Sequence, residues 1–183
     1  MALRWRVEEA LAARVRAPLV PQLRGHLQVA EGMALLDVGG GTGWMAAQLA
    51  AQATVVEPHA GKRRHGARAH PGLTFVDARA EALPFPDASF DRVLFLVSLH
   101  HIADQPQALR EARRVLRPGG RAAVFEMDAR QRGPRWIHAL PVRLGHAIHL
   151  LDPDELASLL RAAGFADVRT ERAPRGYLAS ARA

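Results

Sequence analysis

Cysteine and asparagine are absent from the 183 residues, and Lys62 is the one lysine. Without cysteine the chain can form no disulfide framework, no thiolate zinc site and no cysteine nucleophile. A single lysine leaves little room for Schiff-base catalysis. Several classes of covalent and metal chemistry are therefore excluded before any motif is considered.

Long apolar runs are missing as well. No stretch approaches the ~18 residues of a membrane-spanning helix, and the N-terminus carries Glu8 and Glu9 and no apolar signal core. We therefore expect a cytoplasmic protein without a membrane span. A composition of 49% apolar and 23% charged residues is ordinary for a globular protein, and the length fits one domain with a proper core.

Acidic residues are outnumbered, and the net charge is +7 at pH 7. Such a balance raises the prospect of an acidic partner such as nucleic acid. The arginines are scattered, however, and few aromatic residues lie among them to stack on bases. Drift of the composition towards arginine is the favoured explanation, and nucleic acid is kept as a less favoured partner.

Strand and helix patterns alternate along the chain. Apolar runs predict strands at 33–38, 53–57, 73–77, 92–98 and 121–127, and two short strands near 166–172 and 176–182. Helices are expected within 3–24, at 43–51, in the segment that ends at His70, and at 107–116, where RPGG stops the helix. A last helix is expected to start at the acidic N-cap and proline of 152–153 and to end at Gly164. This alternation predicts an α/β fold with a doubly wound sheet, whose ligands sit beyond the carboxyl ends of the strands.

The stretch LLDVGGGTG, residues 35–43, ends an apolar strand in an acid and follows it with four glycines in five residues. Such a density indicates a tight turn or a ligand that approaches the backbone closely. A phosphate-binding P-loop needs a lysine that this loop lacks. A dinucleotide fingerprint needs a third glycine where the chain has Trp44. The spacing present is G-x-G-x-G, over Gly39, Gly41 and Gly43.

Two acids flank this loop. Glu57 ends the second strand, 14 residues past Gly43, where its carboxylate can accept both ribose hydroxyls of a nucleoside. Asp37, directly before the glycines, would repel a pyrophosphate and suits a ligand with an ammonium group; a structural cap for the loop is the alternative. A nucleoside joined to an amino acid without phosphate describes S-adenosylmethionine.

Four segments occur in order: LLDVGGGTG, VVEP, ARAEALPFPDASFD and VLFLVSLHHIADQPQALREARRVLRPGG. In this order and spacing they resemble the class I S-adenosylmethionine-dependent methyltransferases, especially the small quinone-biosynthesis (UbiE-like) enzymes, strongly over residues 33–128. The resemblance implies an enzyme whose cofactor is S-adenosylmethionine. It also implies a Rossmann-like, seven-stranded, mostly parallel sheet whose last strand is antiparallel, with helices on both faces.

We therefore expect a single methyltransferase domain over residues 1–183, with four parts. These are N-terminal helices at 1–30, a cofactor-binding core at 31–128, a substrate-covering segment at 128–151, and a C-terminal helix with a strand pair at 152–183. The sequence leaves open whether the protein is a monomer or a homodimer.

The resemblance assigns roles to individual positions. The three spaced glycines would approach the methionine part of the cofactor, Asp37 would orient its ammonium group, and Glu57 would bind the ribose. The remaining cofactor contacts would be Pro58 and His59 near the adenine, a backbone N–H of Ala80 to the ring, and Ser98 and Leu99 near the sulfonium.

Arg79 departs from the family pattern. The family usually has an aspartate there, whose carboxylate accepts a hydrogen bond from the adenine amino group, and arginine cannot accept one. Asp77, two residues away on the same face of an extended segment, is the candidate substitute. Arg79 is therefore still expected to contact the cofactor, but its role at the adenine is not assigned.

His100 and His101 follow the fourth strand, at the mouth where the methyl group would be delivered. A histidine there could deprotonate a substrate hydroxyl, since its pKa lies near working pH; a role in the local turn alone is the alternative. In the substrate-covering segment, Trp136, Ile137 and Leu140 form either an apolar pocket wall or part of the core. The same segment holds His138, His146 and His149, for which no metal site is expected.

The acceptor is constrained mainly by absences. No [DNS]-P-P-[FYW] motif of amino-methylating nucleic-acid enzymes occurs, and the lack of cysteine excludes carbon-5 pyrimidine methylation through a thiolate. A small molecule, such as an aromatic hydroxyl or a quinol-like ring, is the first choice of methyl acceptor. An RNA methyltransferase and a non-catalytic cofactor-binding domain are the alternatives.

Overall fold

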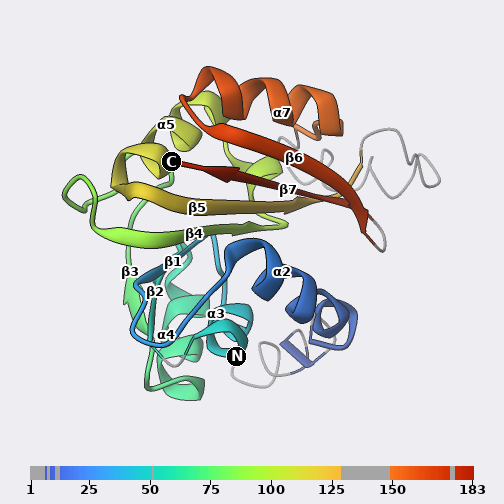
Figure 1. Cartoon of the computed structure of the whole chain (residues 1–183). Coiled ribbons are helices and arrows are strands. Elements are labelled where there is room, and N and C mark those ends of the chain that lie inside the picture. Colours follow the sequence, from blue (N-terminus) through green and yellow to red (C-terminus); the bar gives the residue numbers. More distant parts are fainter. Residues whose placement is uncertain (1–6, 8, 11–12, 51, 129–148, 174–175) are drawn as a thin grey trace.

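Seven strands form one sheet with helices on both faces in the computed structural model, which describes residues 7, 9–10, 13–50, 52–128, 149–173 and 176–183 (Figure 1). The strand order is β3-β2-β1-β4-β5-β7-β6. β7 runs antiparallel to both of its neighbours, and the other neighbouring strands are parallel. The predicted doubly wound, mostly parallel sheet with a reversed last strand is confirmed.

The strands are β1 Leu35–Val38, β2 Ala53–Val56, β3 Thr74–Val76, β4 Phe90–Leu96, β5 Leu116–Glu126, β6 Ala166–Ala173 and β7 Gly176–Arg182. The helices are η1 Ala17–Leu19, α2 Val20–Leu27, α3 Trp44–Leu49, α4 Ala60–Ala69, η2 Leu99–His101, α5 Gln105–Val115 and α7 Pro153–Ala162.

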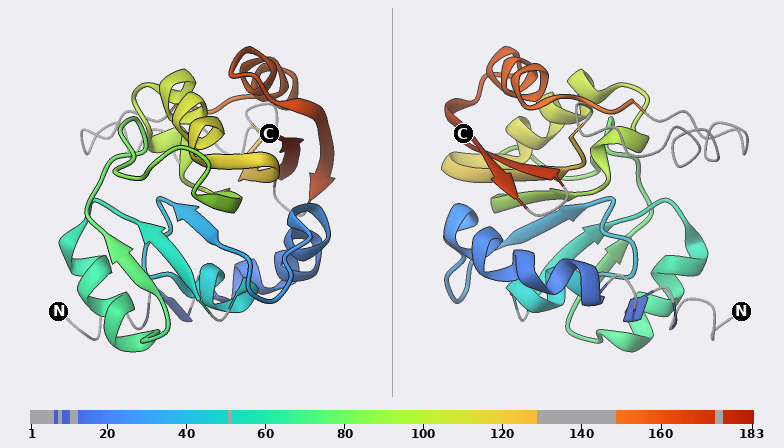
Figure 2. Two further views of the ribbon diagram at one scale, coloured as in Figure 1. Left: turned by 60° about the vertical axis from the view of Figure 1, so that its left-hand side comes forward. Right: turned by 90° about the vertical axis from the view of Figure 1, so that its right-hand side faces the viewer.

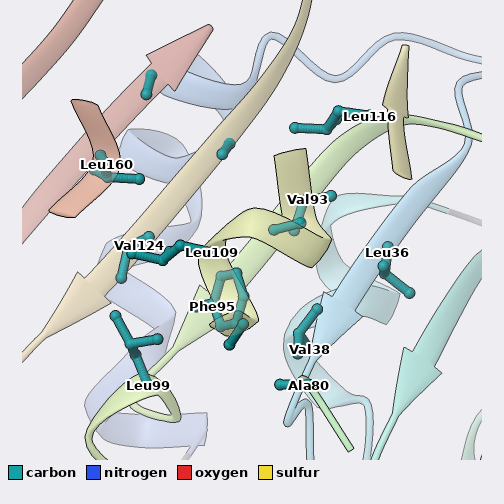
Figure 3. Close-up of a cluster of buried hydrophobic side chains, with 14 of the residues drawn as sticks. Leu36, Val38, Ala80, Val93, Phe95, Leu99, Leu109, Leu116, Val124 and Leu160 are labelled. Carbon is teal, nitrogen blue, oxygen red and sulfur yellow. The ribbon is translucent and has the colours of Figure 1, made fainter. Parts of the chain in front are cut away.

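Both faces of the central strands are buried, which explains the uninterrupted apolar run of β4. Val93 and Phe95 lie in the core cluster shared with α5 and α7, which Figure 3 shows in close-up. Leu94 and Leu96 belong to the opposite cluster, with η1, α2 and α3. Alternate residues of one strand therefore hold helices on the two faces of the sheet.

The start of α7 follows the sequence signal closely. The side chain of Asp152 accepts hydrogen bonds from the backbone N–H groups of Asp154 and Glu155, and the Glu155 side chain accepts from the Asp152 N–H. This reciprocal capping box, with Pro153 at the first helical position, satisfies donors that the helix itself leaves unpaired.

The boundary between α5 and β5 differs from the sequence expectation. The helix does end before RPGG, but β5 begins at Leu116, which pairs with Phe90, and not at Arg121. The register then shifts between Phe90 and Arg92, so that RPGG forms an irregularity within the strand. Gly119 has a left-handed φ of 75°, which a glycine adopts without strain.

Candidate cofactor and active site

A cavity of about 830 Å³ opens where β1, β2 and β4 end. Its walls come from the loops that follow these strands and the loop after β3, and their residues include Gly39–Thr42, Val56–Pro58, Ala78–Glu81 and Leu96–Ser98. The strand order reverses between β1 and β4, and ligands of doubly wound sheets bind at such a switch point. The cavity therefore lies where the sequence pattern predicts a ligand.

The glycine loop lies so close to its neighbours that side chains would clash. A Cβ at Gly39, whose φ is 71°, would come within 2.7 Å of the Cβ of Ser98. A Cβ at Gly40 would come within 2.5 Å of the Asp37 carboxylate. Ser98 is fixed in turn, because its hydroxyl donates a 2.8 Å hydrogen bond to the carbonyl of Val38. The loop thus presents bare backbone to the cavity.

Glu57 joins the end of β2 to this loop. Its side chain is only 5% exposed and lines the cavity. One carboxylate oxygen accepts from the backbone N–H of His59 at 2.8 Å, and the other accepts from the N–H of Gly41 at 3.1 Å. These bonds hold the carboxylate in one orientation beside the glycines.

Asp37 lies beneath the loop and is fully buried; it does not line the cavity itself. Neither of its carboxylate oxygens has a hydrogen-bond partner among the described residues. Burial raises the pKa of Asp37 to about 7; Arg16 opposes this shift, and Glu57 adds to it. An unpaired buried acid under a backbone cradle fits a ligand that brings a positive charge.

The part of the cavity that was expected to hold the adenine differs in part from the expectation. Arg79 and Ala80 line it, but Asp77 does not: its side chain is exposed and pairs with Arg63 at 2.5 Å. The proposed substitution by Asp77 is therefore wrong. The carboxylate beside Arg79 in the cavity is that of Glu81, at 3.3 Å.

Pro58 lines the cavity as expected, whereas His59 does not. The His59 ring nitrogen Nδ1 accepts hydrogen bonds from the backbone N–H groups of Gly61 and Lys62, which caps α4. This capping role was not anticipated, because the start of α4 carries none of the usual Ser, Thr, Asp or Asn caps.

The two adjacent histidines occupy different environments. His101 is exposed and lines the cavity, whereas His100 is buried, with Nδ1 2.6 Å from a carboxylate oxygen of Glu126. The other Glu126 oxygen accepts from the backbone N–H of Leu99 at 2.8 Å. Leu99 packs in the apolar core and does not line the cavity, contrary to expectation. Of the two candidate bases, only His101 reaches the cavity.

Several residues that line the cavity are not among those that the sequence predicted. They include Glu9, Arg16, Thr42 and Lys62. Glu9 accepts hydrogen bonds from Thr42 at 3.2 Å and from His70 at 2.9 Å, and pairs with His65 at 2.8 Å. Burial alone would raise the pKa of Glu9, but the hydrogen bonds from the two histidines lower it below its ordinary value. The N-terminal segment is thereby fastened to the glycine loop.

Among the substrate-side residues, His149 lines the cavity, and its backbone N–H donates to the carbonyl of His100 at 2.9 Å. The other candidates lie outside the described residues: Trp136, Ile137, His138, Leu140 and His146. Within the described part of the chain, no group of three or more His, Asp or Glu side chains could hold a metal ion. No helix in that part is long and apolar enough to cross a membrane.

A family model described as "Methyltransferase domain" matches residues 36–124. The 27-O-demethylrifamycin SV methyltransferase of Amycolatopsis mediterranei is 38% identical over 130 residues, which cover 66% of this chain and 48% of that protein. The ubiquinone/menaquinone biosynthesis C-methyltransferase UbiE of Paracoccus denitrificans is 40% identical over 109 residues, which cover 54% and 44%. The chain thus spans about half the length of these curated relatives.

Solved structures share the whole architecture. A crystal structure of an S-adenosylmethionine-dependent methyltransferase from Thermotoga maritima matches with a TM-score of 0.77 at 25% identity, over 98% of this chain and 92% of that one. A putative methyltransferase in complex with the Trm112 activator of Haloferax volcanii matches with a TM-score of 0.81 at 16% identity, over 96% and 93%. The latter likeness shows the fold alone.

The fold and the matched segment are similar to those of class I S-adenosylmethionine-dependent methyltransferases. Residues 36–124 belong to the methyltransferase-domain family, and the chain is similar to UbiE-like enzymes within it. The cofactor of this family is S-adenosylmethionine.

Proposed function

We propose that the protein transfers the methyl group of S-adenosylmethionine to a small-molecule acceptor, an aromatic hydroxyl or quinol-like ring. The observation that carries the proposal is the convergence of Glu57, the glycine loop and His101 on one cavity. Glu57 and the glycine loop would hold a nucleoside and an amino acid, and His101, a side chain able to take a proton, lines the same cavity.

The cofactor would be held by two kinds of group. The backbone of Gly39, Gly41 and Gly43 would lie against the methionine part, and the unpaired Asp37 beneath the loop would favour its ammonium group. Glu57 would accept from the ribose hydroxyls. The adenine would lie between Pro58 and the loop around Ala80, where Glu81 offers the acceptor that Arg79 cannot.

When bound, S-adenosylmethionine supplies an electrophilic methyl group on its sulfonium. The protein then has to position the acceptor and remove the proton of its hydroxyl group. His101 would accept the proton of an acceptor hydroxyl. The buried pair of His100 and Glu126 holds the turn that carries His101, because Glu126 also accepts from the backbone at the start of η2. Position and electrostatics therefore supply the catalysis.

The relatives support a small acceptor. One is named for 27-O-demethylrifamycin SV and the other for ubiquinone/menaquinone biosynthesis. Both names refer to small molecules.

The test is incubation of the purified protein and isotopically labelled S-adenosylmethionine with two fractions of a cell extract, small molecules and RNA. We expect labelled product in the small-molecule fraction, found by mass spectrometry, and none with a Glu57→Gln variant. Label in RNA would overturn the small acceptor in favour of an RNA methyltransferase. Binding of the cofactor without label in either fraction would indicate a non-catalytic domain.

A further inference from the structure

Arginines gather at the edge of the sheet opposite the cofactor cavity. Arg92 of β4 lies in register with Arg121 of β5, and Arg121 with Arg182 of β7. Arg169 of β6 pairs with Ser180, two residues before Arg182. Residues directly opposite each other, or two apart in a strand, lie on the same face of a sheet. The four arginines therefore share one face on four neighbouring strands.

This face is the one covered by α2, which lies beside β7 and β6 in both views of Figure 2. Leu94, Ala123 and Leu178 lie two residues from Arg92, Arg121 and Ser180 along their strands, on the same face, and belong to the core cluster that includes α2. α2 also contacts the strands directly, because His26 hydrogen-bonds to Ser180. The arginines thus lie where the helix-covered face meets solvent.

The arrangement costs stability in the absence of an anion, because like charges on directly paired strand positions repel. Burial lowers the pKa of Arg92, the nearby Asp91 raises it, and the positive charge of Arg121 lowers it further. The guanidinium groups of Arg92 and Arg121 therefore repel each other. Among the described residues, the side chains of Arg121 and Arg169 have no hydrogen-bond or ion-pair partner, and that of Arg182 pairs with Asp167 at 2.9 Å. The repulsion is therefore only partly offset within the described chain.

Three of the four arginines, Arg121, Arg169 and Arg182, line a cavity of about 400 Å³ together with Asp167, the partner of Arg182. Its inner wall carries the hydroxyl of Ser180, which is 8% exposed and lies 3.0 Å from Nδ1 of His26. Nε2 of His26 is in turn 2.8 Å from Glu171. Gln22 of α2 also lines the cavity, and its side-chain amide can donate a hydrogen bond. Ordered polar groups thus face the same space as the arginines.

We propose that this cavity, the arginine pocket, binds the phosphoryl group of a small phosphorylated molecule. Guanidinium groups match phosphate oxygens with pairs of parallel hydrogen bonds, and the side-chain amide of Gln22 can donate one more. The volume suits a small ligand, and no Phe, Tyr or Trp among the described residues lines the pocket to stack on nucleic-acid bases. The inference is independent of the methyl-transfer proposal, because it uses different residues at the other edge of the sheet.

The test uses inorganic pyrophosphate as the probe, in calorimetric titrations of the full chain at low salt. Arg121→Gln and Arg169→Gln should each weaken binding by about tenfold or more, the usual size of a lost charged hydrogen bond. Arg161→Gln, an exposed arginine of α7 outside the pocket, is the matched control and should bind like the wild type. In the absence of anion, Arg121→Gln should melt at or above the wild-type temperature, because it removes repulsion. Loss of binding could then not be attributed to unfolding.

Three results would overturn the proposal. The first is no binding of millimolar pyrophosphate, or equal binding by wild type and both pocket variants. The second is displacement of pyrophosphate by saturating S-adenosylhomocysteine, which would put the anion in the cofactor cavity. The third is binding of a single-stranded RNA oligonucleotide that the pocket substitutions weaken and that pyrophosphate does not compete with, which would indicate a nucleic-acid surface.

Discussion

Single residues decide the shape of the cofactor site, and Gly39 is the sharpest case. Its left-handed backbone and its approach to Ser98 leave no room for a Cβ. The glycine spacing in the sequence revealed this need for bare backbone. The same spacing could not reveal which neighbour enforces it, since Ser98 follows β4 and lies far from Gly39 in the sequence.

Gly39→Ala should therefore destabilise the protein by about 1–3 kcal/mol, the range for a strained backbone or an overpacked site. Gly25 in α2 is the control, because a Cβ there meets nothing within 4 Å and its φ is not left-handed. Gly25→Ala should be neutral or stabilise by roughly 0.5–1 kcal/mol. Urea denaturation of both variants measures the difference, and equal effects would contradict the close approach.

Asp37 makes stability depend on pH. Its folded pKa of about 7 lies above the ordinary 3.8, so between these values the folded protein holds a proton that the unfolded chain releases. Stability contributed by this group is present at low pH and is lost as pH rises towards 7. The full loss is on the order of 4 kcal/mol, at about 1.36 kcal/mol per pKa unit.

Asp37→Asn removes the titration and keeps the shape of the side chain. In the cofactor-free protein, the melting temperature of the variant minus that of the wild type should increase as pH is raised from 4 to 8. Differential scanning calorimetry across that range is the measurement. A stability difference that stays constant with pH would show that Asp37 does not titrate there.

At the scale of elements, the sequence predicted the strands best. β1 and β4 are mainly apolar and almost entirely buried, with the run VLFL in β4, and such strands leave few alternatives. The start of β5 was missed because a Pro-Gly-Gly segment usually marks a turn and here lies within a strand irregularity. His59, Asp77 and Leu99 were misplaced for another reason: the direction of a side chain in a loop depends on its neighbours in three dimensions.

The N-terminal segment is held to the glycine loop and α4 through Glu9. Glu9→Gln should loosen this segment, and amide hydrogens of residues 13–16 should exchange about tenfold faster at pH 7, as for one lost charged hydrogen bond.

The contribution of Glu9 to stability also depends on pH. Since the folded pKa of Glu9 is lowered from 4.5, this contribution is present above pH 4.5 and is lost as pH falls through the lowered pKa. Glu31→Gln, on an exposed residue, is the control and should leave exchange unchanged.

At the scale of the whole molecule, the sheet separates two regions of different chemistry. The edge where the parallel strands end carries two buried acids, Asp37 and Glu57, beside a backbone cradle. The opposite edge carries the arginine pocket, with three arginines. The net charge of +7 was interpreted from the sequence as dispersed. Strand register brings together arginines that are up to 90 residues apart in the chain, and no sequence pattern predicts that.

The central claim is that the acidic edge binds a sulfonium nucleoside and not a dinucleotide. Titration calorimetry with S-adenosylmethionine and with NAD tests it most directly, together with a Glu57→Ala variant. We predict binding of S-adenosylmethionine, no comparable binding of NAD, and a loss of about 1.5–3 kcal/mol in the variant, the usual contribution of hydrogen bonds to a charged group. Absence of heat with S-adenosylmethionine, micromolar binding of NAD, or an unchanged affinity after Glu57→Ala would contradict the account.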